Sequence, residues 1–186
     1  MKQQVFSNWQ VVDEVGRRKY LNTEERARFL AIAERMPPRI CALCHVLAFT
    51  GCRITEALRL TPYQLNEGML TIATLKRRKL HFRLVPVPLG VVAMLDVLAG
   101  DGASPYFPWH RATAWRHVKH VMYLARIEGP MACCKGIRHT FAMYALKCGV
   151  PSNLVQRWLG HASAATTAIY LDAVGIEERE FAERMW

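Results

Sequence analysis

The sequence predicts an α+β protein that is mostly helical and has one small antiparallel β-sheet. Apolar residues recur at helical spacing through most of the chain, and only residues 68–88 change to a strand-like pattern. The chain has 186 residues, of which 52% are hydrophobic and 22% are charged. This composition supplies one sizeable core and is not typical of a disordered chain.

The N-terminal elements are predicted from cap and stop residues. Residues 1–20 are mixed and include the basic cluster Arg17-Arg18-Lys19, so we expect an arm rather than a packed element. Asn22 and Glu25 have capping-box spacing and predict the start of the first helix. Met36-Pro37-Pro38 predicts its end.

Apolar spacing predicts further helices over 39–50, 54–60, 89–99, 110–127, 137–148, 151–159, 163–171 and 176–186. Gly51 is expected to close the helix before it in a left-handed conformation. Residues 69–75 and 82–87 are strand-like and flank the stretch Lys76-Arg77-Arg78-Lys79. This arrangement predicts a β-hairpin with a cationic tip.

The chain is strongly basic. It has 25 Lys and Arg residues against 15 Asp and Glu residues, a net charge of +10. The expected partner is a polyanion, either a nucleic acid or an anionic membrane surface. No apolar run reaches the roughly 18–20 residues of a membrane span, and residues 1–8 lack the apolar core of a signal peptide. We therefore expect a cytoplasmic protein.

The six cysteines do not predict a metal site. Cys41 and Cys44 form a CxxC motif, but no second pair repeats this spacing, and structural zinc needs four convergent ligands. In a reducing cytoplasm the cysteines are expected to be buried small hydrophobic residues. We expect no metal and no cofactor.

Three separated blocks of the sequence stand out. They are Thr50-Gly51-Cys52-Arg53-Ile54-Thr55-Glu56, then Gly136-Ile137-Arg138-His139-Thr140, and then Trp158-Leu159-Gly160-His161 followed by Thr166-Thr167-Ala168-Ile169-Tyr170. Each block alone is a weak signal. Together, in this order and with a basic hairpin between the first two, they resemble the catalytic domain of the tyrosine recombinases, also called the phage integrase family.

The resemblance covers roughly residues 20–186 and implies an N-terminal arm, 1–20, followed by a tyrosine recombinase catalytic domain, 21–186. Members of the family usually carry an N-terminal helical domain that clamps the other face of the DNA. The chain therefore resembles a stand-alone catalytic domain. It is expected to be either a naturally small recombinase, like the fimbrial phase-variation invertases, or a truncated form.

The resemblance assigns roles to four residues. Tyr170 matches the nucleophile, and an ordinary tyrosine of an amphipathic helix is the alternative. Arg53 and Arg138 match the two catalytic arginines, and His161 matches a histidine that donates a hydrogen bond to the phosphate. Arginine suits this role because its guanidinium is a permanently charged fork of donors.

Two further residues are expected to support the site. Glu56 lies one helical turn after Arg53, where the family often has an acidic residue that orients the arginine. The alternative is an exposed helix carboxylate. His139 follows Arg138 directly, and adjacent helical residues point about 100° apart, so we expect it to pack or to support the site.

The lysines leave alternatives open. Lys135 stands three residues before Arg138, where the family usually has histidine, and a charged lysine is a poor general base. Removal of the Tyr170 proton is therefore unassigned, and a surface or DNA-backbone lysine is the alternative for Lys135. The family places a general-acid lysine on the hairpin. We favour Lys76, next to the strand, over Lys79, nearer the tip.

The remaining cations are expected to be solvated or to contact the DNA backbone, among them Arg59, Arg77, Arg78, Arg83, Arg116 and Arg126. The helix over 110–127 carries several of the basic residues and is expected to face DNA.

The resemblance implies a site-specific DNA recombinase or integrase that works through a 3′-phosphotyrosyl intermediate, without metal or ATP. The alternatives are a type IB-like DNA-relaxing enzyme and a DNA-binding regulator without efficient catalysis. The implied partners are double-stranded DNA and other copies of the chain, as a tetramer on synapsed DNA. Accessory DNA-binding proteins are compatible with this function, and the implied location is the nucleoid. The segment after Tyr170 is expected to pack on a neighbouring protomer or on its own domain.

Overall fold

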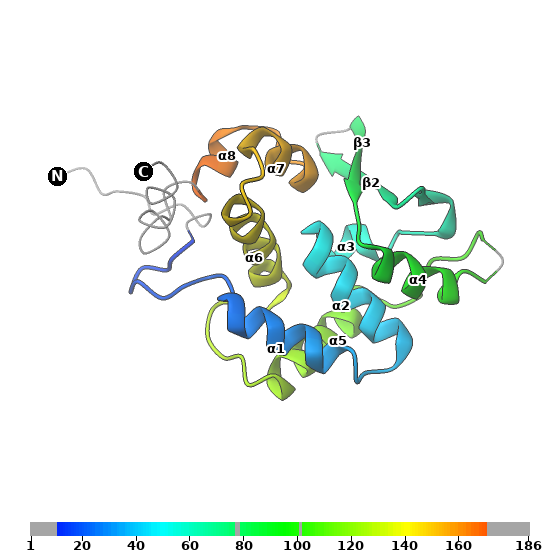
Figure 1. Cartoon of the computed structure of the whole chain (residues 1–186), viewed down its shortest axis with the longest axis horizontal. Coiled ribbons are helices and arrows are strands. Elements are labelled where there is room, and N and C mark those ends of the chain that lie inside the picture. Colours follow the sequence, from blue (N-terminus) through cyan, green and yellow to red (C-terminus); the bar gives the residue numbers. More distant parts are fainter. Residues whose placement is uncertain (1–10, 77–78, 101, 171–186) are drawn as a thin grey trace.

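The computed structural model describes residues 11–76, 79–100 and 102–170, and for residues 75, 76, 79 and 80 the backbone alone is described (Figure 1). The predicted fold class is confirmed, because the chain is mostly helical with one small antiparallel sheet. The elements in chain order are α1 (Thr23–Ala33), α2 (Pro38–Thr50), α3 (Ile54–Ala57), the 3₁₀ helix η1 (Pro62–Gln64), β1 (Leu65–Asn66), β2 (Met69–Lys76), β3 (Lys79–Pro86), α4 (Leu89–Leu98), α5 (Arg111–Leu124), α6 (Cys134–Lys147), α7 (Ser152–Leu159) and α8 (Ala165–Ala168).

The start of α1 and the end of α2 follow the predictions, whereas α1 ends at Ala33, before the predicted stop at Met36-Pro37-Pro38. Asn22 Oδ1 accepts the N–H of Glu25 at 2.7 Å, and Glu25 Oε2 accepts the N–H of Asn22 at 2.8 Å. Pro38 starts α2 instead of ending α1, since its fixed φ and missing N–H suit a first helical turn. Gly51 closes α2 at a φ of 60°.

α2 forms the centre of the larger core. Its residues from Ile40 to Ala48 are all buried, and it packs against α1, α4, α5 and α6. Figure 1 shows α1, α4 and α5 arranged around it. A smaller second core joins α6 to α7 through Ala142, Val155 and Leu159.

β2 and β3 form the predicted hairpin, and β1 adds a short third strand in the order β1-β2-β3. The ladder ends at the pair Lys76 and Lys79, so β3 begins three residues earlier than predicted. Residues 77–78 alone separate the strands. The sequence did not predict β1, because a two-residue strand has no detectable period.

Three helix boundaries near the motif blocks differ from the prediction. α3 ends at Ala57 rather than at residue 60. α6 begins at Cys134 rather than at residue 137, which places Lys135 and Arg138 on one helix. α8 is shorter than the predicted helix over 163–171, and Tyr170 lies just beyond it with its N–H bonded to Thr167 O at 3.0 Å. The predicted helix over 176–186 lies outside the described residues.

Part of the expected arm is packed, contrary to the prediction. Val11 is buried in the smaller core, because the apolar residues of α6 and α7 give it cover. A turn closed by a bridge between Val12 and Arg18 follows. Leu21 N–H then donates to Thr140 Oγ1 of α6 at 2.7 Å. The division between arm and domain at residue 20 stays a prediction.

Three of the six cysteines follow the prediction, since Cys41, Cys44 and Cys52 are buried. Cys133 and Cys134 are only partly buried, and Cys148 is exposed because it caps the C-terminal end of α6 at the surface. Within the described ranges, no three His, Cys, Asp or Glu side chains form a group that could hold a metal ion. None of the helices described is long and apolar enough to cross a bilayer.

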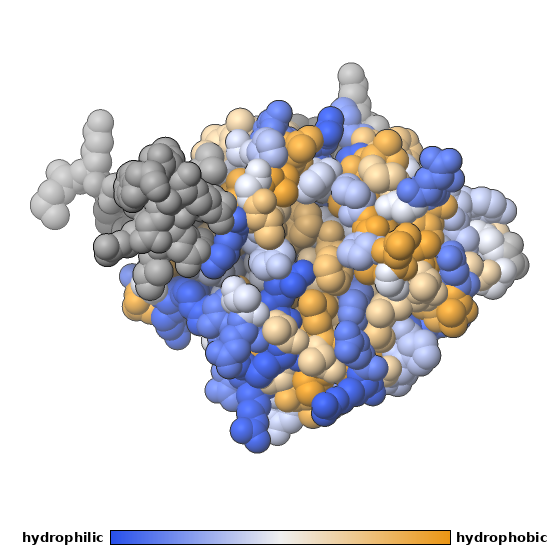
Figure 2. All heavy atoms as spheres, in the orientation of Figure 1, coloured by the Kyte–Doolittle hydropathy of each residue, from blue (hydrophilic) through white to orange (hydrophobic). Residues whose placement is uncertain are grey.

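Figure 2 shows hydrophilic and apolar side chains mixed over this face of the molecule, with apolar ones gathered on the side of β3 and α4. The exposed apolar residues of those two elements are Phe82, Leu84, Leu89 and Val97.

Candidate active site

The three motif blocks meet at the side chain of Arg138. It projects from α6 and donates through Nη1 to Gly51 O at 2.7 Å and through Nη2 to Leu159 O at 2.6 Å. Arg138 thus joins the end of α2 to the end of α7. Burial and the neighbouring charge of Arg53 lower the pKa of Arg138 to about 10, so it stays protonated at neutral pH.

Arg53 and Glu56 form an ion pair at the start of α3. Glu56 Oε1 accepts from Arg53 Nη1 at 2.9 Å, and Glu56 Oε2 accepts the backbone N–H of Arg53 at 2.9 Å. The same carboxylate therefore caps α3 and holds the arginine. The Glu56 side chain is 7% exposed, so the alternative of an exposed helix carboxylate is wrong.

Arg53, Lys135 and Arg138 line one open pocket of about 580 Å³. More than 80 residues separate Arg53 from the other two cations in the sequence, and the fold brings them together. Arg111 and Trp115 of α5 line the same pocket. Sequence reasoning placed Arg111 on a DNA-facing helix, but it did not predict that either residue joins the motif residues. The three convergent cations form an anion-binding surface.

Lys135 is half-buried in the first turn of α6. It lies three residues before Arg138, so both side chains project from the same face of the helix. Burial and the nearby charge of Lys19 lower the pKa of Lys135 below its ordinary value. Lys19 belongs to the expected arm, so the N-terminal segment brings a further positive charge close to this site.

Tyr170, the expected nucleophile, is buried at 2% exposure. Its hydroxyl lies 2.9 Å from His139 Nδ1, within hydrogen-bond distance. Burial raises the pKa of Tyr170 to about 12, although the charges of Arg138 and Arg53 oppose that rise. In this conformation the phenol is therefore protonated at neutral pH.

His139 does not line the cationic pocket, in agreement with its position next to Arg138 on the helix. Burial, together with the charges of Lys135 and Arg138, lowers the pKa of His139 to about 4. A neutral ring is the result, and its Nδ1 can accept the phenolic proton of Tyr170 in a hydrogen bond. Sequence reasoning expected a packing or supporting residue and could not predict this contact, since 31 residues separate the pair.

His161 follows the end of α7 and stacks on Tyr170, with ring centroids 6.3 Å apart and ring planes 12° apart. Its Nδ1 lies 2.9 Å from Thr167 Oγ1. His161 also lines a second open pocket of about 740 Å³, between α7 and the sheet. The histidine and the tyrosine expected from the sequence are thus neighbours.

Arg83 departs most from the prediction. It was expected to be solvated or to contact the DNA backbone, yet its side chain is 4% exposed and forms an ion pair with Glu56 at 2.6 Å. It also donates to Trp158 O at 2.6 Å and to Thr74 Oγ1. The inward-facing position on β3 explains this burial, because the neighbours Phe82 and Leu84 face outward and are exposed.

The hairpin lysines are defined only by their backbone positions. Lys76 and Lys79 are register partners at the end of the β2–β3 ladder. The expectation that Lys79 lies nearer the tip is therefore wrong, because the ladder continues as far as this pair. Their side chains lie outside the described residues, as do Arg77 and Arg78.

Close packing excludes a side chain at Gly51 and leaves little room for one at Gly160. A Cβ atom on Gly51 would lie 2.5 Å from Phe141 Cδ1 and 2.8 Å from Leu159 Cδ2. A Cβ atom on Gly160 would lie 3.1 Å from Arg83 Nη1. Both residues also have a positive φ, which glycine adopts without steric cost.

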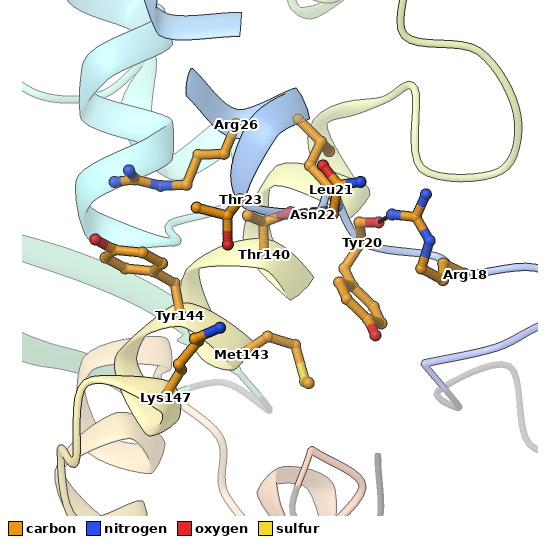
Figure 3. A pocket seen from close by; sticks show the side chains of 10 residues that line it. All are labelled: Arg18, Tyr20, Leu21, Asn22, Thr23, Arg26, Thr140, Met143, Tyr144 and Lys147. Atoms are coloured by element: carbon orange, nitrogen blue, oxygen red, sulfur yellow. Dashed lines mark hydrogen bonds between the residues drawn. The ribbon is translucent and has the colours of Figure 1, made fainter. Parts of the chain in front are cut away.

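A smaller pocket of about 120 Å³ lies where residues 18–23 meet α6 (Figure 3). Arg26 stands over the Tyr144 ring there, with its guanidinium carbon 4.3 Å from the ring centroid. Thr140, which accepts the N–H of Leu21, lines the same pocket. The chain at the junction of the arm and α1 therefore contacts α6 at Thr140, the residue after His139.

Comparison with known proteins decides the family. The family model described as "Phage integrase family" matches residues 19–174. The chain belongs to the phage integrase family. The matched range contains every motif residue discussed above and ends shortly after Tyr170.

Sequence relatives in the family include tyrosine recombinases named XerD. The chain is 31% identical to XerD of Pseudomonas putida over 156 residues, covering 75% of this chain and 51% of that protein. It is 29% identical to XerD of Yersinia pestis over 146 residues, covering 69% of this chain and 48% of that protein. The chain thus spans about half the length of these relatives.

Solved structures of the family share the fold. XerA recombinase matches with a TM-score of 0.74 and 27% identity, covering 89% of this chain and 62% of that one. The catalytic domain of bacteriophage HP1 integrase matches with a TM-score of 0.67 and 22% identity, covering 82% of this chain and 86% of that domain. The chain therefore has the fold of a tyrosine recombinase catalytic domain.

Proposed function

We propose that the protein is a site-specific DNA recombinase that cleaves and rejoins strands through a 3′-phosphotyrosyl intermediate. The observation that carries this proposal is that Arg53, Lys135 and Arg138 line one pocket. Tyr170 lies close enough to Arg138 and Arg53 for their positive charges to lower its pKa. Membership of the phage integrase family supports the proposal.

The proposed chemistry uses the charges of the pocket. Tyr170 Oη attacks the scissile phosphorus and loses its proton, a bond to the 3′-phosphate forms, and the bond to the 5′-oxygen breaks. Arg53, Arg138, Lys135 and His161 stabilise the negative charge on the phosphoryl oxygens. A hairpin lysine, Lys76 or Lys79, protonates the leaving 5′-oxygen.

Metal and ATP are not required in this scheme. The arginines and lysines supply the positive charge that a metal ion supplies in other phosphoryl transfers. The phosphotyrosyl bond conserves the energy of the broken phosphodiester, so the reverse attack by a 5′-hydroxyl rejoins the strand without another energy source.

Tyr170 must leave its resting environment before it attacks. Its hydroxyl is buried, bonded to His139 and held at a raised pKa. A phosphate bound beside Arg53 and Arg138 neutralises the charges that oppose this rise, so the Tyr170 pKa would rise further if the phenol stayed in place. We propose that DNA binding rearranges the segment that carries Tyr170.

Double-stranded DNA is the proposed partner. XerH recombinase, whose solved structure is a post-cleavage complex with a palindromic difH substrate, shares the fold with a TM-score of 0.71 and 24% identity, covering 88% of this chain and 52% of that one. A tetramer on synapsed DNA, accessory DNA-binding proteins and action at the nucleoid remain predictions. So does the role of the segment after Tyr170, which lies outside the described residues.

The test is a nicked suicide duplex in EDTA. Duplexes that tile the DNA flanking the gene are incubated with the protein and resolved on a denaturing gel. We expect a covalent protein–DNA band from the wild type and none from Tyr170→Phe, which lacks the attacking oxygen but keeps the ring. A band that requires added metal would contradict the metal-independent scheme.

The same substrates separate the alternative functions. Adduct together with recombinant product supports the recombinase. Adduct with relaxation of supercoiled plasmid but no recombinant product supports a DNA-relaxing enzyme. Binding without adduct on any duplex overturns the proposal and supports a DNA-binding regulator.

A further inference from the structure

Arg83 binds three separate segments around the candidate active site. Its Nη2 donates to Glu56 Oε2 of α3 at 2.6 Å, its Nε donates to Trp158 O of α7 at 2.6 Å, and its Nη1 donates to Thr74 Oγ1 of β2. We call Arg83, Glu56, Thr74 and the Trp158 carbonyl the Arg83 cluster. Only the fork of a guanidinium reaches three acceptors in these directions.

The Arg83 cluster continues directly to Arg53. Glu56 uses Oε2 for Arg83 and Oε1 for Arg53, at 2.6 Å and 2.9 Å. The charges of Arg83 and Arg53 outweigh the burial of Glu56 and hold the pKa of that carboxyl below its ordinary value. One ionised carboxylate therefore links an arginine on the hairpin to the arginine that lines the phosphate pocket.

The cluster also fixes the hairpin against the end of α7. The carbonyls of Trp158 and Leu159 accept from Arg83 and from Arg138 respectively, both at 2.6 Å. Gly160 leaves room for this approach, because its Cβ would lie 3.0 Å from Thr74 Oγ1 and 3.1 Å from Arg83 Nη1. The absence of a side chain at Gly160 thus allows the hairpin to pack closely against the end of α7.

Contact with DNA does not account for Arg83. Its side chain is 4% exposed, and its donors already bind protein acceptors. Neutralisation of Glu56 alone does not account for it either, since Arg53 already pairs with that carboxylate. The hydrogen bonds that remain to be explained are those to Thr74 and to Trp158. The first joins β3 to β2, and the second joins the hairpin to α7.

We infer that Arg83 is a positioning residue that holds the β2–β3 hairpin in a fixed place relative to Arg53. Thr74 lies two residues before Lys76, and Arg83 lies four residues after Lys79, so the cluster anchors both strands next to the pair Lys76 and Lys79. The inference rests on the proposed function, in which a hairpin lysine protonates the leaving oxygen. Arg83 acts through the hairpin and does not itself touch DNA.

Two variants test this role. Arg83→Lys keeps the charge but loses the three-way fork, and Thr74→Val removes one acceptor while keeping the shape of the side chain. Arg35→Lys, at an exposed arginine after α1, is the matched control. Single-turnover cleavage is measured on a nicked duplex with an ordinary 5′-oxygen and on one with a 5′-bridging sulfur, which leaves without protonation because a thiol is far more acidic than an alcohol.

On the oxygen substrate we expect Arg83→Lys to lose about 10- to 100-fold in rate, as a displaced general acid would cause, and Thr74→Val to lose less. On the sulfur substrate both variants should cleave close to the wild-type rate. Arg138→Lys should be slow on both substrates, and Arg35→Lys should match the wild type on both. Equal losses on the two substrates, or no loss, would overturn the inference.

Hydrogen exchange gives a readout that does not depend on activity. Arg83→Lys should speed amide exchange in β2 and β3 and leave α1 and α4 unchanged, whereas unchanged protection of the hairpin would contradict the inference. A wild type without any adduct overturns the proposed function before the variants are compared. The exchange experiment still decides whether Arg83 holds the hairpin.

Discussion

At the scale of single residues, burial decides the state of the candidate active site. Tyr170 and His139 lie in contact, and burial pushes their pKa values apart, to about 12 and about 4. Both groups are therefore neutral over the physiological range. The pair holds the nucleophile in its protonated form, and the charges of Arg138 and Arg53 lower the Tyr170 pKa once solvent reaches the phenol and removes the effect of burial.

Replacement of His139 should change how stability depends on pH. Its folded pKa of about 4 lies below the ordinary value of 6.5, so its contribution is complete above pH 6.5 and is lost as the pH falls toward 4. The wild type should lose up to about 3 kcal/mol of unfolding free energy over this interval through this group. His139→Gln should lose correspondingly less, as measured by urea unfolding at several pH values.

The control for this prediction is His120→Gln, which removes an exposed histidine from α5. It should follow the wild-type pH dependence, because that ring is in water in the folded and the unfolded state. If His139→Gln loses as much stability as the wild type over the same interval, His139 is protonated in the folded protein and the assignment of a neutral ring is wrong.

At the scale of elements, the ends of helices carry the site. Gly51 is the C-cap of α2, Arg53 is the N-cap of α3, and Gly160 is the C-cap of α7. Buried arginines bind the carbonyls that these ends leave open, since Arg138 takes those of Gly51 and Leu159. The positive charges complement the negative ends of the helix dipoles and hold the motif blocks together.

Gly51→Ala should be strongly destabilising. The new Cβ would meet Phe141 at 2.5 Å, and the residue already has a φ of 60°. We expect the free energy of unfolding to fall by at least about 3 kcal/mol, from backbone strain together with overpacking. Urea unfolding at neutral pH measures the change.

Gly149→Ala is the matched control for the element-scale prediction. That glycine has a φ of 79°, but nothing lies within 4 Å of the added Cβ. Its free energy of unfolding should therefore fall only by the cost of the strained backbone, about 1–2 kcal/mol. Equal losses at the two positions would show that packing against Phe141 and Leu159 does not restrict Gly51.

At the scale of the whole molecule, the basic residues behind the net charge of +10 include two groups with different roles. Arg83 and Arg138 are buried and bind protein acceptors, so they build the site. Arg111 and Arg116 are exposed on α5 and are free to meet a phosphate backbone. Long-range attraction to DNA depends on the second group.

Arg111→Gln should weaken DNA binding in a salt-dependent way. Arg111 lines the pocket that holds Arg53 and Lys135, so it is expected to neutralise a phosphate near the cleavage site. The slope of log K against log salt should become shallower by about 0.9. Fluorescence anisotropy with a labelled duplex at several salt concentrations measures it.

Arg35→Gln, which removes an exposed arginine after α1, should leave that slope unchanged. If the slope changes as much for Arg35→Gln as for Arg111→Gln, the attraction is spread over the surface. In that case α5 has no special part in binding DNA.

Local chemistry made much of the fold predictable. The capping box at Asn22 and Glu25, the left-handed Gly51 and the strand-like period around the basic hairpin each depend on neighbours within a few residues. The motif blocks were also recognisable, because their residues and their order along the chain resemble those of the tyrosine recombinases. The short strand β1 was not predictable, because two residues have no detectable period, and the start of α6 at Cys134 was missed because its first turn lacks an apolar pattern.

The sequence by itself therefore determined the fold class, the family resemblance and the candidate site residues. The tertiary structure alone decided which cations reach the pocket and which become structural. Arg83 and Arg116 were indistinguishable in the sequence, yet one is buried against Glu56 and the other is exposed on α5. The reason is physical: the cost of burying a charge is offset only where the fold supplies acceptors, and Glu56, Thr74 and Trp158 come from three different segments.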